Sequence, residues 1–155
     1  MSGNPFTRPL RETMNDPMFN WARPRFVRRL LVAVFVALLI AMPVLLWATQ
    51  AALILIAMLV PFVFLMGSLN ASVRGLTELR ARDLDERENA MRGGVYAMLY
   101  WPGVFLAVAG GLAMRSLDVG SGFIVTGGGL ALFFLAMGLP VLWLAWSLPD
   151  EPTAD

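Results

Sequence analysis

Hydrophobic positions in this chain follow one another over long stretches, and polar residues are confined to short segments between them. No charged residue occurs from Leu30 through Val73, from Gly93 through Met114 or from Val119 through Pro149. A helix needs about 20 mainly apolar residues to cross the hydrocarbon core of a bilayer. Because the first stretch is long enough for two such helices, the pattern predicts four membrane spans.

Short polar breaks divide these stretches. The pair Thr49-Gln50 separates the first two spans so closely that they should form an antiparallel hairpin, and a Gly-rich loop separates the last two. We therefore predict an all-α integral membrane four-helix bundle made of two helical hairpins. The predicted membrane domain covers 27–148, with spans at 27–48, 51–73, 94–114 and 123–148.

Three segments are predicted to lie outside the spans: an N-terminal interfacial segment (1–26), a loop (74–93) and an acidic tail (149–155). The charged leader is long and no small-x-small cleavage site follows the first apolar run, so we expect a retained span rather than a signal peptide. All twelve basic residues are arginine, six of them within 1–29 and five within 74–93. Short cytoplasmic loops carry an excess of Lys and Arg. This predicts a plasma (inner) membrane protein with both termini cytoplasmic.

Composition excludes much of the usual chemistry. Hydrophobic residues make up 58% of the chain, and neither Cys nor His occurs. Thiol nucleophiles, imidazole bases and the usual zinc ligands are therefore missing. The polar residues of the spans are uncharged, whereas ion-coupled transporters carry ionisable groups inside the membrane. We expect no enzymatic activity, no cofactor or metal site and no nucleic-acid partner.

The most polar internal stretch is Arg80–Gly94, RARDLDERENAMRGG. Five acids and five arginines balance between Arg74 and Arg92, and leucines recur at helical spacing. This predicts an amphipathic cytoplasmic helix over about 75–92, ended by Gly93-Gly94. We interpret it first as a self-neutralised, solvated helix and second as a docking surface for a protein partner. The candidate docking residues are Arg80, Asp83, Glu86 and Arg87.

Two other sets of residues suggest contacts with lipid and between helices. Aromatic rings beside cations suit the headgroup region, although an ordinary basic flank of the first span would look the same. The candidate lipid-interface residues are Trp21, Arg23, Arg25, Arg28 and Arg29. Small residues four apart let helix backbones approach. We assign three such ladders to packing within the chain, or otherwise to a homo-oligomer: Ala33/Ala37/Ala41, Gly67/Ala71/Gly75 and Gly103/Ala107/Gly111.

The segment Leu84-Asp-Glu-Arg-Glu88, followed by Arg92 and Tyr96-Ala97, resembles the L-D-E-R-E segment of small multi-span membrane proteins of the actinobacterial type. The resemblance implies a charged cytoplasmic loop between spans and no catalysis. In those proteins the helix runs on into the next span, whereas Gly93-Gly94 should interrupt it here.

Three functions fit these observations. The first is a non-enzymatic subunit that interacts with, anchors or regulates a membrane-associated complex through its cytoplasmic segments, with membrane lipids and a protein partner or a second copy as its contacts. The second is an oligomeric pore or carrier for small or apolar solutes. The third is a phage or prophage envelope protein of the superinfection-exclusion or holin type.

Overall fold

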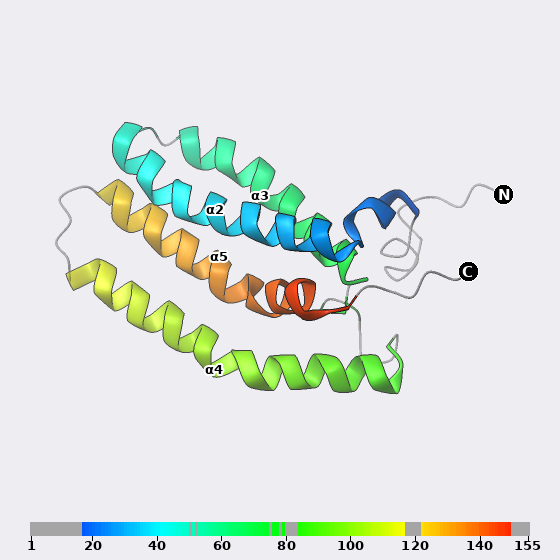
Figure 1. Ribbon diagram of the computed structural model, residues 1–155. Coiled ribbons are helices and arrows are strands. Elements are labelled where there is room, and N and C mark those ends of the chain that lie inside the picture. The colour runs from blue at the N-terminus through cyan, green and yellow to red at the C-terminus, as the bar shows by residue number, and fades with distance from the viewer. Residues whose placement is uncertain are drawn as a thin grey trace.

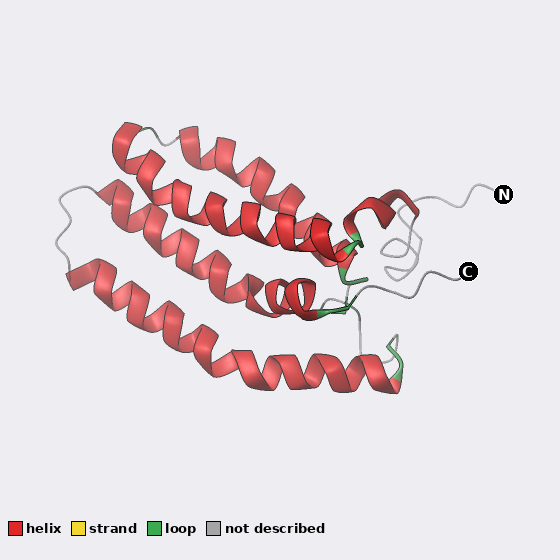
Figure 2. Ribbon diagram, viewed as in Figure 1, coloured by secondary structure: helices red, strands yellow, loops and turns green. Residues whose placement is uncertain are grey.

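Each predicted span corresponds to one long helix in the computed structural model, which describes residues 17–49, 51, 53–74, 76–77, 79, 84–116 and 122–149 (Figure 1). A 3-10 helix, η2 (Pro17–Ala22), precedes α2 (Arg25–Thr49), α3 (Leu53–Ser72), α4 (Glu86–Ser116) and α5 (Gly122–Ser147). No strand occurs among the described residues (Figure 2). The four long helices are all long and apolar enough to cross a membrane. The prediction of an all-α, multi-pass membrane protein is thus confirmed.

The connection between α3 and α4 differs from the amphipathic helix predicted over 75–92. Helix α3 ends at Ser72, and Arg74 adopts a positive φ of 56°. A left-handed residue just beyond the last turn is a common way to end a helix. Residues 76–77 form a turn, and Leu84 and Asp85 are not helical. The described residues of the segment before Glu86 are therefore not helical, and those from Glu86 onward belong to α4.

The predicted break at Gly93-Gly94 is also wrong, because α4 runs through both glycines without interruption. Glycine costs about 1 kcal/mol relative to alanine inside a helix. This penalty weakens a helix but does not end it when residues on both sides remain helical. At 31 residues, α4 is about 46 Å long. The hydrocarbon core is about 30 Å thick, so one end of α4 extends beyond it.

The helices lie side by side in the order α3, α2, α5, α4 (Figure 1). Helix α2 makes its most extensive contacts with α5 and also packs on α3, while α3 contacts α5 less extensively. Helix α4 packs chiefly on α5. As a result α2, α3 and α5 enclose a shared core, and α4 forms an outer element.

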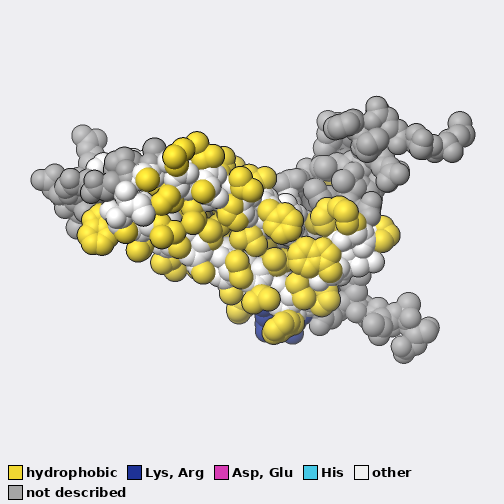
Figure 3. Space-filling view, turned by 90° about the horizontal axis from the view of Figure 1, so that it is seen from above, with side chains coloured by type: hydrophobic (Ala, Val, Ile, Leu, Met, Phe, Trp, Pro, Cys, Tyr) yellow, Lys and Arg dark blue, Asp and Glu magenta, His cyan; other side chains and the backbone are white. Residues whose placement is uncertain are grey.

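The core is apolar and lies mainly toward the end where α2 begins and α5 ends. Phe62 of α3 joins the three enclosing helices, with its ring centroid 5.1 Å from that of Phe35 and 4.0 Å from that of Phe134. Leu69, Leu144 and Ala145 extend the core toward that end and are fully buried. Much of the outer surface is also hydrophobic, and one small group of arginine side chains interrupts the face seen in Figure 3. A hydrophobic exterior is what lipid as the surrounding solvent requires.

Only some residues of the three small-residue ladders lie at contacts between helices. Ala33 and Ala37 are exposed, and a Cβ added at Gly67 or Gly111 would meet nothing within 4 Å. The first ladder therefore faces outward at two of its three positions, which contradicts its assignment to packing within the chain. A ladder shows that a neighbouring helix could approach, but not that one does. Of the other positions, Ala71 and Gly103 are buried, Ala41 and Ala107 are half-buried, and Gly75 lies outside the described residues.

Other glycines make the close approaches. A Cβ at Gly127 of α5 would lie 3.0 Å from Cα of Pro43 and 2.6 Å from Cδ1 of Leu46, so the backbones of α2 and α5 meet there. A Cβ at Gly110 would overlap the side chain of Leu132. Gly103 faces the carbonyl oxygen of Ala136, with 3.7 Å from its ideal Cβ position to that oxygen. Because Pro140 has no N–H to bond the Ala136 carbonyl, Gly103 lets α4 approach the group that the proline leaves without its helical donor.

Candidate functional site

Charged side chains of the described residues gather where α2 begins, α3 ends, α4 begins and α5 ends. We call this the charged end. Its residues flank these four helix ends: Arg23, Arg25, Arg28, Arg29, Arg74, Asp85, Glu86, Arg87, Glu88 and Arg92. Among the described charged residues, Arg115 alone lies at the opposite end, in the last turn of α4.

Arg28 joins α2 to the C-terminal end of α5. Its side chain is only 3% exposed, and Nη2–H groups donate to the carbonyl oxygens of Leu148 at 2.7 Å and Pro149 at 3.0 Å. The last carbonyls of a helix have no partner within it, and they carry partial negative charge. A guanidinium supplies both donors and positive charge. Arg28 therefore contacts the chain itself, which departs from the lipid-interface role predicted for it.

Arg29, the next residue, contacts the same end of α5 in another way. Its guanidinium carbon lies 4.9 Å from the ring centroid of Trp146, a cation–π distance. Arg29 Nε is buried and finds no acceptor among the described residues. The same holds for Nε and Nη2 of Arg23, in the bend before α2. Trp21 and Arg25, the other candidate lipid-interface residues, are exposed.

The L-D-E-R-E segment forms the N-terminal cap of α4. The Glu88 N–H donates to Asp85 Oδ1 at 2.7 Å, and the Asp85 N–H donates to Glu88 Oε2 at 3.0 Å. This reciprocal pair is a capping box, with Asp85 as the N-cap residue. It also places acidic side chains at the positive end of the helix dipole. Glu86 and Arg87 of the first turn are exposed, whereas the candidate docking residues Arg80 and Asp83 lie outside the described residues.

Buried polar groups at the end of α3 hold the loop that follows. Asn70 is 2% exposed, and its Oδ1 accepts a hydrogen bond of 2.8 Å from Thr77 Oγ1. Arg92 of α4 donates to the carbonyl oxygen of Leu79 and to Asn89 Oδ1. Tyr96 Oη donates to the Thr77 carbonyl at 3.4 Å. No role was predicted for Asn70 or Thr77, although the uncharged polar residues Ser68, Asn70 and Ser72 at the end of an apolar run were a signal.

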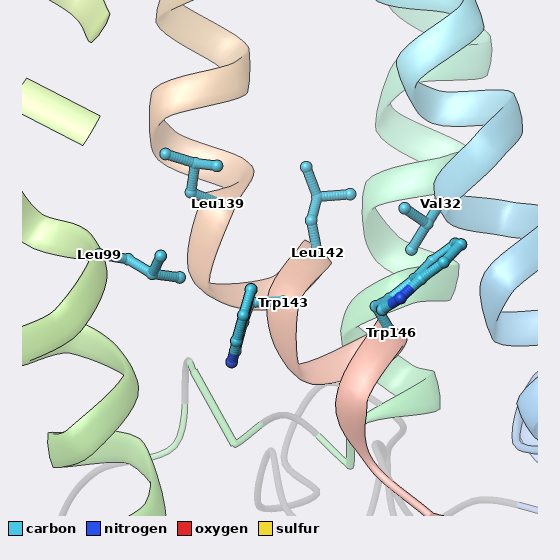
Figure 4. A pocket seen from close by; sticks show the side chains of 6 residues that line it. All are labelled: Val32, Leu99, Leu139, Leu142, Trp143 and Trp146. Atoms are coloured by element: carbon cyan, nitrogen blue, oxygen red, sulfur yellow. The ribbon is translucent and has the colours of Figure 1, made fainter. Parts of the chain in front are cut away.

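An apolar groove of about 270 Å³ begins beside Trp146 (Figure 4). Helix α5 provides its floor through Leu139, Leu142, Trp143 and Trp146, and Val32 of α2 and Leu99 of α4 provide its walls. In Figure 4 the Trp143 ring nitrogen points toward the charged end. The groove exists because α2 and α4 both flank α5. We name it the α5 groove.

No group of three or more His, Cys, Asp or Glu side chains that could hold a metal ion occurs within the residues that the structure describes. Of the acids at the start of α4, Asp85 and Glu88 bond each other's backbone N–H groups in the cap, and Glu86 is exposed. In comparisons with known proteins, no family model, curated protein or solved structure matches the chain.

Proposed function

We propose that this protein is a non-enzymatic subunit of a membrane-associated complex, which it anchors or regulates through its charged end. The helices form two antiparallel hairpins in the plasma membrane, α2 with α3 and α4 with α5. Both termini and the loop 74–93 are cytoplasmic, because arginines concentrate there. The partner is a cytoplasmic or membrane protein that recognises the charged end.

One observation carries the proposal: the charged end has exposed ionic groups on a rigid support. Glu86 and Arg87 project from the first turn of α4, which the Asp85–Glu88 capping box fixes. Neighbouring charges of opposite sign suit recognition by a complementary surface, since such complementarity gives specificity and orientation. The membrane-spanning parts carry no comparable polar chemistry among the described residues.

Affinity purification in mild detergent after chemical cross-linking in native membranes tests the proposal. The double variant Glu86→Arg/Arg87→Glu reverses both exposed charges but keeps the net charge of the loop, so it should leave the membrane topology unchanged. We expect a stoichiometric partner with the starting protein and at least a tenfold loss with the double variant, equivalent to about 1.4 kcal/mol.

Arg25→Gln is the matched control, because Arg25 is an exposed arginine at the same end but on α2. It should retain the partner. Recovery of the protein without a partner, or equal recovery with the double variant, would contradict the proposal. A cross-linked product of twice the chain mass would identify a second copy as the partner.

A further inference from the structure

We propose that the α5 groove, together with Arg29, binds one anionic phospholipid of the cytoplasmic leaflet, with an acyl chain in the groove and the phosphate at the guanidinium. This inference concerns lipid rather than a protein partner, and it does not depend on the proposed docking at Glu86 and Arg87.

The groove and the cation are physically continuous. Trp146 lines the groove, and the Arg29 guanidinium lies over the ring of the same residue. From Trp146 the floor continues along α5 to Leu139, a rise of about 10 Å at 1.5 Å per residue. The site is therefore cationic at one end and apolar along its length, which is the polarity of a phospholipid.

The lining suits an acyl chain better than a polar small molecule. All six lining residues have apolar or indole side chains. At about 270 Å³ the groove is slightly smaller than the range of about 300–1,000 Å³ that is usual for small-molecule pockets. Its side is open, as an acyl chain that enters from the surrounding bilayer requires. The two tryptophans lie near the charged end, and rings of this kind prefer the level of the headgroups.

Charge complementarity selects an anionic headgroup. Arg29 Nε is a buried donor with no acceptor among the described residues, and the same is true of Arg23 Nε and Nη2. A buried donor without an acceptor destabilises the protein. Phosphate oxygens are strong acceptors for guanidinium groups and bind them in a bidentate manner. Arg28 Nε is also buried without an acceptor among the described residues, but Nη2 of Arg28 donates to the carbonyl oxygens of Leu148 and Pro149, just after α5.

Quenching of tryptophan fluorescence by brominated lipids tests the site. The reporter protein carries Trp21→Phe, Trp47→Phe and Trp101→Phe, which leaves Trp143 and Trp146 as its fluorophores. It is reconstituted in bilayers that contain either brominated phosphatidylglycerol diluted with plain phosphatidylcholine, or brominated phosphatidylcholine diluted with plain phosphatidylglycerol. We expect about a fivefold preference for phosphatidylglycerol, the factor that one arginine near an anionic surface contributes.

Three variants of the reporter decide between a built site and a general surface effect. Arg29→Gln should abolish the preference, while Arg87→Gln, which removes an exposed charge at the same end, should keep it. Leu99→Phe narrows the groove from α4 and should reduce quenching by phosphatidylglycerol, whereas Leu112→Phe on the exposed face of α4 should not.

Equal quenching by the two lipids in the reporter would overturn the proposal. So would a preference that survives Arg29→Gln, or one that survives Leu99→Phe, because each would indicate charge attraction without the groove. Arg29→Lys is the control for a folding defect in Arg29→Gln, because it keeps the positive charge. It should retain about half of the lipid preference on a logarithmic scale, since an ammonium lacks the planar, bidentate geometry of a guanidinium.

Discussion

Arg28 and Leu148 are joined by a hydrogen bond of 2.7 Å between Nη2 and the carbonyl oxygen, although 120 positions separate them in the chain. This contact fixes the first turns of α2 beside the end of α5. Arg29 adds a cation–π contact with Trp146, so two successive arginines of α2 contact the C-terminal end of α5. The same pair of arginines separates two roles, since one is buried in the protein and the other lies at the mouth of the α5 groove.

Replacement of the buried guanidinium should destabilise the helix assembly. We expect Arg28→Gln to lower the free energy of unfolding by about 2 kcal/mol, because hydrogen bonds to charged groups contribute about 1.5–3 kcal/mol each. Unfolding in mixed micelles, followed by far-UV circular dichroism during a titration with sodium dodecyl sulfate, measures this change. Arg87→Gln, at an exposed position, should change it by less than about 0.5 kcal/mol. Equal midpoints for the two variants would show that the Arg28 contact contributes little.

Two glycines of one triplet should respond oppositely to the same substitution. Gly127→Ala forces a methyl group against the Pro43 backbone and Leu46, so it should destabilise the protein by about 1–3 kcal/mol. Gly129→Ala enters open space and should be neutral or stabilising by up to about 1 kcal/mol, because alanine favours the helix. The same unfolding titration compares them. If Gly129→Ala proved the more harmful change, the arrangement of α2 against α5 would be wrong.

The capping box predicts a local effect at the start of α4. Loss of the N-cap side chain costs about 1 kcal/mol, so Asp85→Ala should speed amide hydrogen exchange in the first turn of α4 about fivefold. Asp85→Asn retains an acceptor and should stay near the original rate. Exchange measured by mass spectrometry on peptides that cover 84–95 reports this directly. Identical rates for Asp85→Ala and Asp85→Asn would exclude the cap.

The hydrogen bond from Thr77 to Asn70 should hold the loop after α3. Thr77→Val removes the donor to a buried amide oxygen, and an unsatisfied buried acceptor costs about 1–3 kcal/mol. We expect trypsin to cleave between α3 and α4 several times faster in this variant. Thr49→Val is the control, since the Thr49 hydroxyl bonds only the Leu45 carbonyl of its own helix in the contact that the structure shows. Unchanged cleavage in Thr77→Val would mean that other contacts hold the loop.

The length of the uncharged stretches predicted the four helices. A segment that crosses lipid must bond its own backbone groups, as a helix does, and the thickness of the bilayer sets how long the helix is. The leucines of the loop were also informative: Leu76, Leu79 and Leu84 are buried, although the described residues around them form turns rather than the predicted helix. Balanced charges and leucines at helical spacing are compatible with a helix, but they do not show at which residue it begins. Only the three-residue spacing of Asp85 and Glu88, which is typical of a capping box, indicates where α4 begins.

Contacts between helices could not be predicted to the same degree. Small-residue spacing marked Gly111, whereas the close approach involves Gly110, one position away on the helix. Gly127 lies outside the three predicted ladders, but it is where α5 meets Pro43. Which face of an apolar helix meets a neighbour depends on the position of all the other helices. In a chain whose helices are apolar on every side, the sequence carries little information about that choice.

Site-directed labelling tests the central claim most directly, because the natural chain has no cysteine. Thr49→Cys places a thiol at the exposed end of α2, and Arg87→Cys places one in the exposed first turn of α4. In intact cells a membrane-impermeant maleimide should label Thr49→Cys at once and Arg87→Cys only after the cells are opened. Labelling of Arg87→Cys in intact cells, with Thr49→Cys protected, would contradict the proposed membrane arrangement.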